Sequence, residues 1–172
     1  EEVKLSKRTG KTITLNELID DVGVNAARYF FASKSLDTQM DFDLDLAVKN
    51  SNDNPVYYIE YANARISSIL RKQDCDVVDT FGTIDNELAY TIVKKLIMFE
   101  DVVVSAAARE LPHLIANYLY ELAGLFHSYY SSEKIVTEDS IYTKEHIALI
   151  KAIKMVMNNA DNLIGIILRE EM

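Results

Sequence analysis

Apolar residues at helical spacing run through the middle of the sequence and constrain its fold more than any other feature. The residues that recur every three or four positions after Pro55 are Val56, Ile59, Ala62 or Asn63, Ile66 and Leu70. This spacing places them on one face of an α-helix, which a core must cover. The 172 residues include only five Gly and two Pro, so residues that break helices are scarce. The sequence therefore predicts an all-α fold, a helical bundle over residues 51–172.

A small, mostly helical connecting region is expected before the bundle, over residues 1–50. Thr14 and Glu17 have the spacing of a capping box, so a short helix begins there and ends near Gly23. A second helix is expected from about Asn25 to Ser33, and residues 35–42 alternate polar and apolar as an extended segment does.

Caps and polar stretches set the expected limits of the later helices. Asn54 is a good capping residue and Pro55 suits the first helical position. A polar loop is expected over residues 131–143. The remaining predicted helices cover residues 84–99, 100–110, 112–130 and 144–162.

Charge and composition exclude several classes of protein. The chain has 18 Lys and Arg against 27 Asp and Glu, a net charge of −9. Residues 1–11 carry +2, which leaves −11 on the rest and argues against broad, sequence-blind binding of nucleic acid. Recognition of unpaired bases by aromatic and Arg side chains is still open.

No apolar run approaches the 18 residues of a membrane span. The single cysteine, Cys75, excludes a disulfide framework and favours a cytoplasmic protein. The chain begins at Glu1 rather than Met, and we expect it to be part of something longer.

The side chains that commonly perform hydrolysis do not form a complete active site. His113, His127 and His146 are far apart in the sequence, and none has a companion that makes a metal-binding pair on one helix face. Cys75 lies between Asp74 and Asp76, whose charges disfavour a thiolate. No metal site is expected.

A basic segment near the start has groups that suit polyphosphate. Lys4 and Lys7 supply point charges, Arg8 supplies a fork of donors and Ser6 supplies a hydroxyl. Charges placed in this way stabilise phosphoryl or nucleotidyl transfer. The alternative is an ordinary solvated basic segment.

Tyrosines and an arginine share one face of the predicted helix after Pro55. Tyr58, Tyr61 and Arg65 are spaced by three and four residues, and this combination can stack on unpaired bases. The alternative is amphipathic packing with the hydroxyls at the surface. A further aromatic group is expected to lie mainly in the core: Tyr118, Tyr120, Phe126, Tyr129 and Tyr130.

Several segments together resemble the arginyl-tRNA synthetase family. Lys4-Leu5-Ser6-Lys7-Arg8 is similar to the KMSK signature of class I aminoacyl-tRNA synthetases, with Leu in place of Met. The segments that indicate arginine are Val22-Gly23-Val24-Asn25-Ala26-Ala27-Arg28-Tyr29-Phe30-Phe31, Asp41-Phe42-Asp43-Leu44-Asp45-Leu46-Ala47, Asn54-Pro55-Val56-Tyr57-Tyr58-Ile59, Tyr61-Ala62-Asn63-Ala64-Arg65-Ile66, His113-Leu114 and Tyr118-Leu119-Tyr120-Glu121-Leu122-Ala123. The resemblance runs to Met172.

The resemblance implies site residues and cofactors. The family's KMSK loop closes over the phosphates of ATP, so Lys4, Ser6 and Lys7 would assist catalysis and Lys4 and Lys7 would bind ATP. The family's helical C-terminal domain, the DALR domain, binds the tRNA anticodon. The positions of this chain that match tRNA-binding positions are Tyr58, Tyr61, Arg65, Tyr118 and Met172.

The resemblance also implies an activity for a longer parent. Family members ligate arginine to its tRNA using ATP with Mg²⁺, in the cytoplasm. The sequence lacks the family's Rossmann domain and HIGH-type motif, so this chain alone is expected to be inactive and to hold no cofactor tightly. Expected partners are arginine tRNA and, in the parent, arginine and ATP, with neither DNA nor a membrane, in a monomer. The alternative is a helical protein-interaction scaffold without RNA binding.

Four positions depart from the family pattern. Leu5 replaces Met conservatively. Asn63 stands where the family commonly has His, which puts a contact there in question. Ala160-Asp161 replaces a usual Gly-Leu and is expected to place a charge in the last helix, against close packing.

Overall fold

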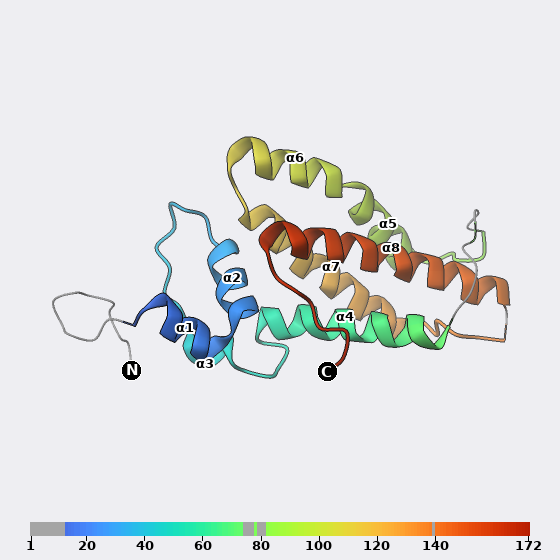
Figure 1. Ribbon diagram of the computed structural model, residues 1–172. Helices are drawn as coiled ribbons and strands as arrows, with labels where there is room; N and C mark the ends of the chain where they lie inside the picture. The colour runs from blue at the N-terminus through green and yellow to red at the C-terminus, as the bar shows by residue number, and fades with distance from the viewer. Residues whose placement is uncertain (1–12, 74–77, 79–81, 139) are drawn as a thin grey trace.

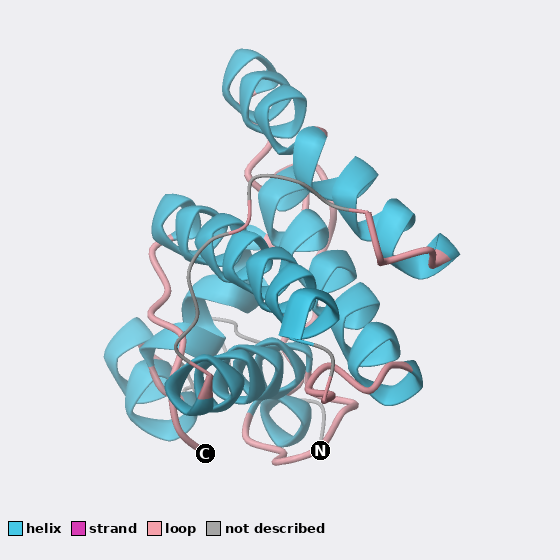
Figure 2. Cartoon of the chain, turned by 90° about the vertical axis from the view of Figure 1, so that its right-hand side faces the viewer, coloured by secondary structure: helices cyan, strands magenta, loops and turns pink. Residues whose placement is uncertain are grey.

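The structure is all-α, as predicted. The computed structural model describes residues 13–73, 78, 82–138 and 140–172, and no strand occurs within these ranges. The helices are α1 (Leu15–Val22), α2 (Val24–Ala32), α3 (Leu44–Ala47), α4 (Pro55–Lys72), α5 (Glu87–Ile97), α6 (Phe99–Arg109), α7 (His113–Ser132) and α8 (Ser140–Ile164). Helices α4, α7 and α8 form the body, α1–α3 pack at one end of it, and α6 projects from it (Figure 1 and Figure 2).

The expected capping residues form the expected caps. The Glu17 amide donates to Thr14 Oγ1 over 3.2 Å, and the Thr14 amide donates to Glu17 Oε2 over 2.7 Å. Gly23 separates α1 from α2 with φ +82°, a backbone region that favours glycine. The Asn54 side chain accepts from the Val56 amide at the start of α4.

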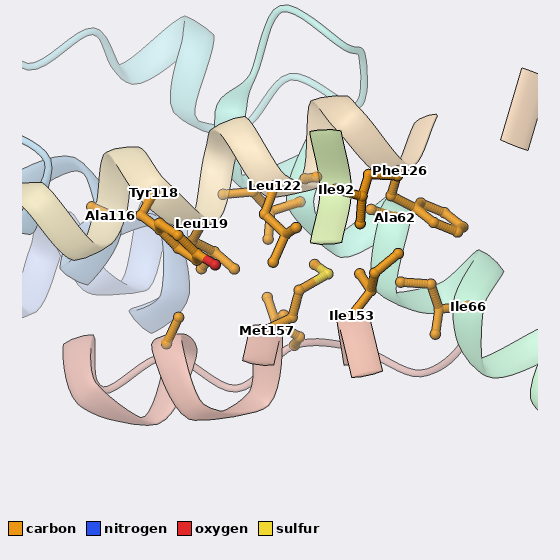
Figure 3. Close-up of a cluster of buried hydrophobic side chains, with 14 of the residues drawn as sticks. Ala62, Ile66, Ile92, Ala116, Tyr118, Leu119, Leu122, Phe126, Ile153 and Met157 are labelled. Carbon is orange, nitrogen blue, oxygen red and sulfur yellow. The ribbon is translucent and has the colours of Figure 1, made fainter. Parts of the chain in front are cut away.

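The core lies between α4, α7, α8 and α5 (Figure 3). The predicted stripe of α4 faces inward: Ile59, Ala62 and Ile66 are completely buried. Opposite them, α7 contributes Leu119, Leu122 and Phe126, and α8 contributes Ile150, Ile153 and Met157, all of them buried. Burial of this kind stabilises by about 1.5–3 kcal/mol per large apolar side chain, so the stripe predicted from spacing is the centre of the fold.

Two local expectations differ from the structure. Helix α8 begins at Ser140, inside the segment expected to be a loop. The polar composition of this segment conceals its packing: Thr143 is buried and accepts from the Thr137 amide, and the Tyr142 ring lies 4.1 Å from that of His146 one turn later. Residues 35–42 form turns and irregular backbone, with no strand partner in the described ranges.

The last helix packs closely despite its departure from the family pattern. Ala160 is completely buried and Asp161 is only 6% exposed. The expected charge is therefore placed inside the fold, and the packing around it is retained.

The C-terminal tail, residues 165–172, folds back over the bundle. It leaves α8 at Gly165, whose φ is +73°, and crosses α4 (Figure 1). The Asn63 side chain donates to the carbonyl oxygen of Arg169 over 2.8 Å, so the tail is fastened to α4 by side-chain contacts.

Candidate nucleic-acid interface

The exposed edge of α4 carries a stacked column of side chains. The rings of Tyr57 and Tyr61 are stacked with their centres 6.1 Å apart, and the Arg65 guanidinium lies 4.3 Å from the centre of the Tyr61 ring. The three residues follow one another at intervals of four, so the helix places each one turn above the last. Arg65 also donates to the Tyr61 hydroxyl.

Helix α7 adds a second wall to this column. The Arg65 guanidinium is also 4.7 Å from the centre of the Tyr130 ring, so two aromatic faces hold it. The His127 ring packs against both tyrosines of the predicted set, with ring centres 4.4 Å from Tyr58 and 5.4 Å from Tyr61. We call the residues of α4 and α7 that form this surface the aromatic face: Tyr57, Tyr58, Tyr61, Arg65, Tyr120, His127 and Tyr130.

His127 is a neutral member of this face at pH 7. Burial lowers its pKa below 6.5; the Tyr58 carbonyl opposes that effect and the charge of Arg65 adds to it. Nε2 lies 3.0 Å from the Tyr58 carbonyl oxygen, so the proton of the neutral ring resides on Nε2 and is donated to it. This bond fixes the orientation of the ring that packs against Tyr58 and Tyr61.

Beside the aromatic face is a hollow of about 440 Å³ at the junction of α2, α3, α4 and the tail. Tyr57 belongs to both features, because its ring stacks on Tyr61 and also lines the hollow. Arg169 and Met172 of the tail line it as well. Met172 is 54% exposed and Arg169 points largely to solvent. A hollow of this volume, with an aromatic side, a thioether and a cation, has room for a planar heterocycle.

The structure thus brings together four of the five predicted tRNA-binding residues. Tyr58, Tyr61 and Arg65 are each half-buried and share the aromatic face, and Met172 joins them through the hollow at Tyr57. Tyr118 is the exception. It is 2% exposed, and its hydroxyl donates over 2.8 Å to the Lys95 carbonyl oxygen, so it offers no face to a base.

The remaining aromatic residues of α7 divide between core and surface. Phe126 and Tyr129 are completely buried, as expected. Tyr120 and Tyr130 are 40% and 37% exposed and belong to the aromatic face. Asn63 is 1% exposed, so it meets the tail rather than solvent.

Sequence reasoning missed Tyr57, His127 and Tyr130. The signal for Tyr57 was present, because it precedes Tyr61 by the same four residues that separate Tyr61 from Arg65. For His127 and Tyr130 there was no such signal, since their place depends on how α7 packs against α4.

Some expectations fall outside the described residues. Lys4, Ser6 and Lys7 of the predicted ATP loop lie there, and so does Cys75. Among the described side chains, no three His, Cys, Asp or Glu gather as metal ligands would. The described helices include none with the length and apolarity needed to cross a membrane.

An all-helical bundle with an aromatic–arginine face has the chemistry of a module that binds unpaired nucleotides. The chain belongs to the DALR anticodon binding domain family, which its residues 59–172 match. This family membership favours the anticodon-binding interpretation over the protein-interaction scaffold.

The resemblance to arginyl-tRNA synthetases is confirmed by individual relatives. An arginine–tRNA ligase of Staphylococcus epidermidis is 46% identical over 177 residues, and one of Geobacillus kaustophilus is 46% identical over 179. Both matches include all of this chain and 32% of the relative, so the chain spans about a third of their length.

Solved structures give the same result for the fold. A crystal structure from Campylobacter jejuni assigned to the arginyl-tRNA synthetases superposes with a TM-score of 0.85 at 29% identity, over 97% of this chain and 37% of that one. The arginyl-tRNA synthetase of Thermus thermophilus gives a TM-score of 0.74 at 24% identity, over 96% and 29%, which shows the shared fold alone.

Proposed function

We propose that the aromatic face and the adjoining hollow bind the anticodon loop of an arginine tRNA. The observation that carries the proposal is the column Tyr57–Tyr61–Arg65, which α7 completes with His127 and Tyr130. Unpaired bases stack on such rings, and each base contributes about 1–3 kcal/mol. Tyr58 would hold the other rings of the aromatic face in position, since its own ring packs on those of His127 and Tyr120.

The hollow gives the proposed interface a place for one base that leaves the stack. Tyr57 would stack on one side of that base, and Met172 would cover it from the tail. Arg169, which also lines the hollow, would meet a phosphate or a base edge. Tyr118 contributes through the core only, because it is buried beneath the surface.

The same proposal extends to the longer protein of which this chain would be a part. That protein would ligate arginine to its tRNA with ATP and Mg²⁺ in the cytoplasm, as a monomer. Lys4, Ser6 and Lys7 would assist at the ATP phosphates, and residues 1–50 would connect this loop to the domain of residues 51–172. Because the chain spans about a third of those relatives, we expect the 172 residues alone to form no arginyl-adenylate, which an ATP–pyrophosphate exchange assay measures.

The anticodon proposal is tested by Tyr61→Ala and Arg65→Ala. Each removes one member of the column, and we expect each to weaken binding of an RNA stem–loop with an arginine anticodon by about fivefold or more, since a stack is worth at least about 1 kcal/mol. Fluorescence anisotropy with labelled RNA measures the affinity. Tyr90→Ala is the matched control, because Tyr90 is 52% exposed on α5, outside the aromatic face.

Two outcomes would contradict the proposal. One is equal affinity of the wild type for the arginine stem–loop and for the same stem–loop with its anticodon replaced. The other is a Tyr61→Ala protein that melts at a much lower temperature and keeps its RNA affinity, which would make Tyr61 a packing residue.

A further inference from the structure

The C-terminal tail is held by side chains of α2, α4 and α8 rather than by a strand or helix of its own. The side-chain amide of Asn25, in the first turn of α2, pairs with the backbone of Ile167 in both directions. Its Nδ2 donates to the Ile167 carbonyl oxygen over 2.7 Å, and its Oδ1 accepts from the Ile167 amide over 3.0 Å. Asn25 thus joins residues 142 positions apart in the sequence.

A buried carboxylate extends this contact along the tail. Asn25 Nδ2 also donates to Glu60 Oε1 over 3.0 Å, and Glu60 Oε2 lies 3.6 Å from Arg169 Nε. Glu60 is only 6% exposed, so its two carboxyl oxygens depend on these partners for polar contacts. One turn along α4, Asn63 donates to the Arg169 carbonyl oxygen over 2.8 Å. Arg169 is therefore held through both its side chain and its backbone.

These contacts act together with the buried side chains of Ile166 and Leu168 to place the last residues of the chain. Arg169 and Met172 form the tail's side of the hollow, and Tyr57 forms part of the other side. Residues 166–169 have no regular secondary structure, and an irregular segment without anchors gains conformational entropy by leaving the surface. If the tail is already ordered in the free protein, RNA binding loses no free energy in ordering it.

We propose that Asn25, Glu60 and Asn63 are positioning residues for RNA binding, which act by holding the C-terminal tail so that Arg169 and Met172 complete the hollow. This inference rests on the proposed function and assigns a role to residues that the aromatic face does not include. Asn25 and Glu60 themselves line the hollow, so the test separates an effect through the tail from a direct contact with RNA.

The first measurement needs no RNA. Hydrogen exchange is followed in wild type, in Asn25→Ala and in Asn117→Ala, a matched control at an exposed position of α7. The Ile167 amide donates to Asn25 Oδ1, so Asn25→Ala should speed its exchange by about tenfold or more, and the amides of α4 should be unaffected. Unchanged exchange across residues 166–172 would overturn the proposal.

The second measurement is a double-mutant cycle with the arginine stem–loop. Asn25→Ala and Met172→Ala should each weaken binding, by about tenfold for Asn25→Ala. The affinity of the double variant should be no lower than that of the single variant with the lower affinity. Removing Met172 costs nothing further once the tail is loose, so the two effects overlap. Effects that multiply would overturn the proposal, because Asn25 would then act independently of the tail.

Asn63→Ala provides an independent test, since Asn63 does not line the hollow. It should speed exchange of the tail and show the same overlap with Met172→Ala. The proposed function and this inference fail in different ways. A wild type that does not distinguish the two stem–loops contradicts anticodon binding. A wild type that distinguishes them but shows multiplying effects contradicts only the role of the tail contacts.

Discussion

Asp161 is a carboxylate inside the fold, near the end of α8. It is 6% exposed, and its Oδ1 has no hydrogen-bond partner. Burial raises its pKa from the ordinary 3.8 to about 6, although the backbone amides of Asn162 and Leu168 partly oppose this. A carboxyl group with a raised pKa is more easily protonated in the folded chain than in the unfolded one. Its contribution to stability is thus greatest below pH 3.8 and is lost as the pH rises through 6.

Asp161→Asn should therefore stabilise the protein at neutral pH and not in acid. The amide keeps the shape of the side chain without its charge. The gain at pH 8 should be about 2–3 kcal/mol, because each tenfold change in proton affinity between the folded and unfolded chain is worth about 1.4 kcal/mol. Urea unfolding of both proteins between pH 4 and 8 measures it. Asp37→Asn, at an exposed loop position, is the control. An equal gain at pH 4 and pH 8 would exclude the charge as its cause.

At the scale of single residues, contacts within one helix can be predicted from the sequence more readily than contacts between two helices. The spacing of four that stacks Arg65 on Tyr61 can be read directly from the sequence. The approach of His127 and Tyr130 to the same column depends on the packing of α7 against α4, which no local spacing encodes. The same applies to Asn25, whose partner Ile167 is 142 residues away.

Glu145 shows how one residue of α8 fixes the start of another element. Its carboxylate accepts from the amides of Gly82, Thr83 and Ile84 and from the Thr83 hydroxyl, over 2.8–3.0 Å. Burial by itself raises its pKa, but these four hydrogen bonds outweigh burial and hold the pKa below 4.5. The charged carboxylate therefore positions the chain just before α5.

Glu145→Gln should loosen this junction. The amide has one acceptor oxygen and turns two N–H donors toward backbone amides, so we expect a loss of about 2 kcal/mol in the free energy of unfolding. Because the pKa is lowered in the folded state, the wild type's advantage should be present above pH 4.5 and lost as the pH falls below it. Chemical unfolding at pH 7 and pH 3.5 checks both statements. Glu138→Gln at an exposed position is the control, and an unchanged midpoint at pH 7 would contradict the prediction.

Helices that begin with a cap were predictable from the sequence. Thr14 and Asn54 form the hydrogen bonds that their types and places indicated. The start of α8 was not, because Tyr142 and Thr143 become helical through contacts with His146 and Thr137 that polar composition conceals. The path of the tail over α4 was also not predictable, since it rests on two buried side chains, Ile166 and Leu168, and on single side-chain hydrogen bonds rather than on a periodic pattern.

For the whole molecule, the question is how an acidic chain would bind RNA at the proposed interface. Two cations near the tail are neutralised by the tail itself: Arg71 lies 3.4 Å from Glu171, and Lys154 lies 2.7 Å from Glu170. The cations of the proposed interface are then Arg65 and Arg169, and the side chain of Arg169 stays 69% exposed although it lies beside Glu60. The net charge of −9 gives no long-range attraction to add to theirs. Stacking must therefore supply most of the affinity.

The binding of the arginine stem–loop should consequently depend only weakly on salt. Two phosphate contacts, at about 0.7 counterions each for a single strand, give a slope of log K against log salt of about −1.4.

Replacing both tail carboxylates, Glu170→Gln with Glu171→Gln, should free Lys154 and Arg71 for phosphate. The slope should then approach about −2.8, with tighter binding at low salt. Affinities measured from about 50 to 300 mM KCl test this, and the pair Glu100→Gln with Asp101→Asn, on the projecting helix α6, makes the same change in net charge away from the interface. If that remote pair steepens the slope as much, total charge and not the tail carboxylates controls the salt dependence.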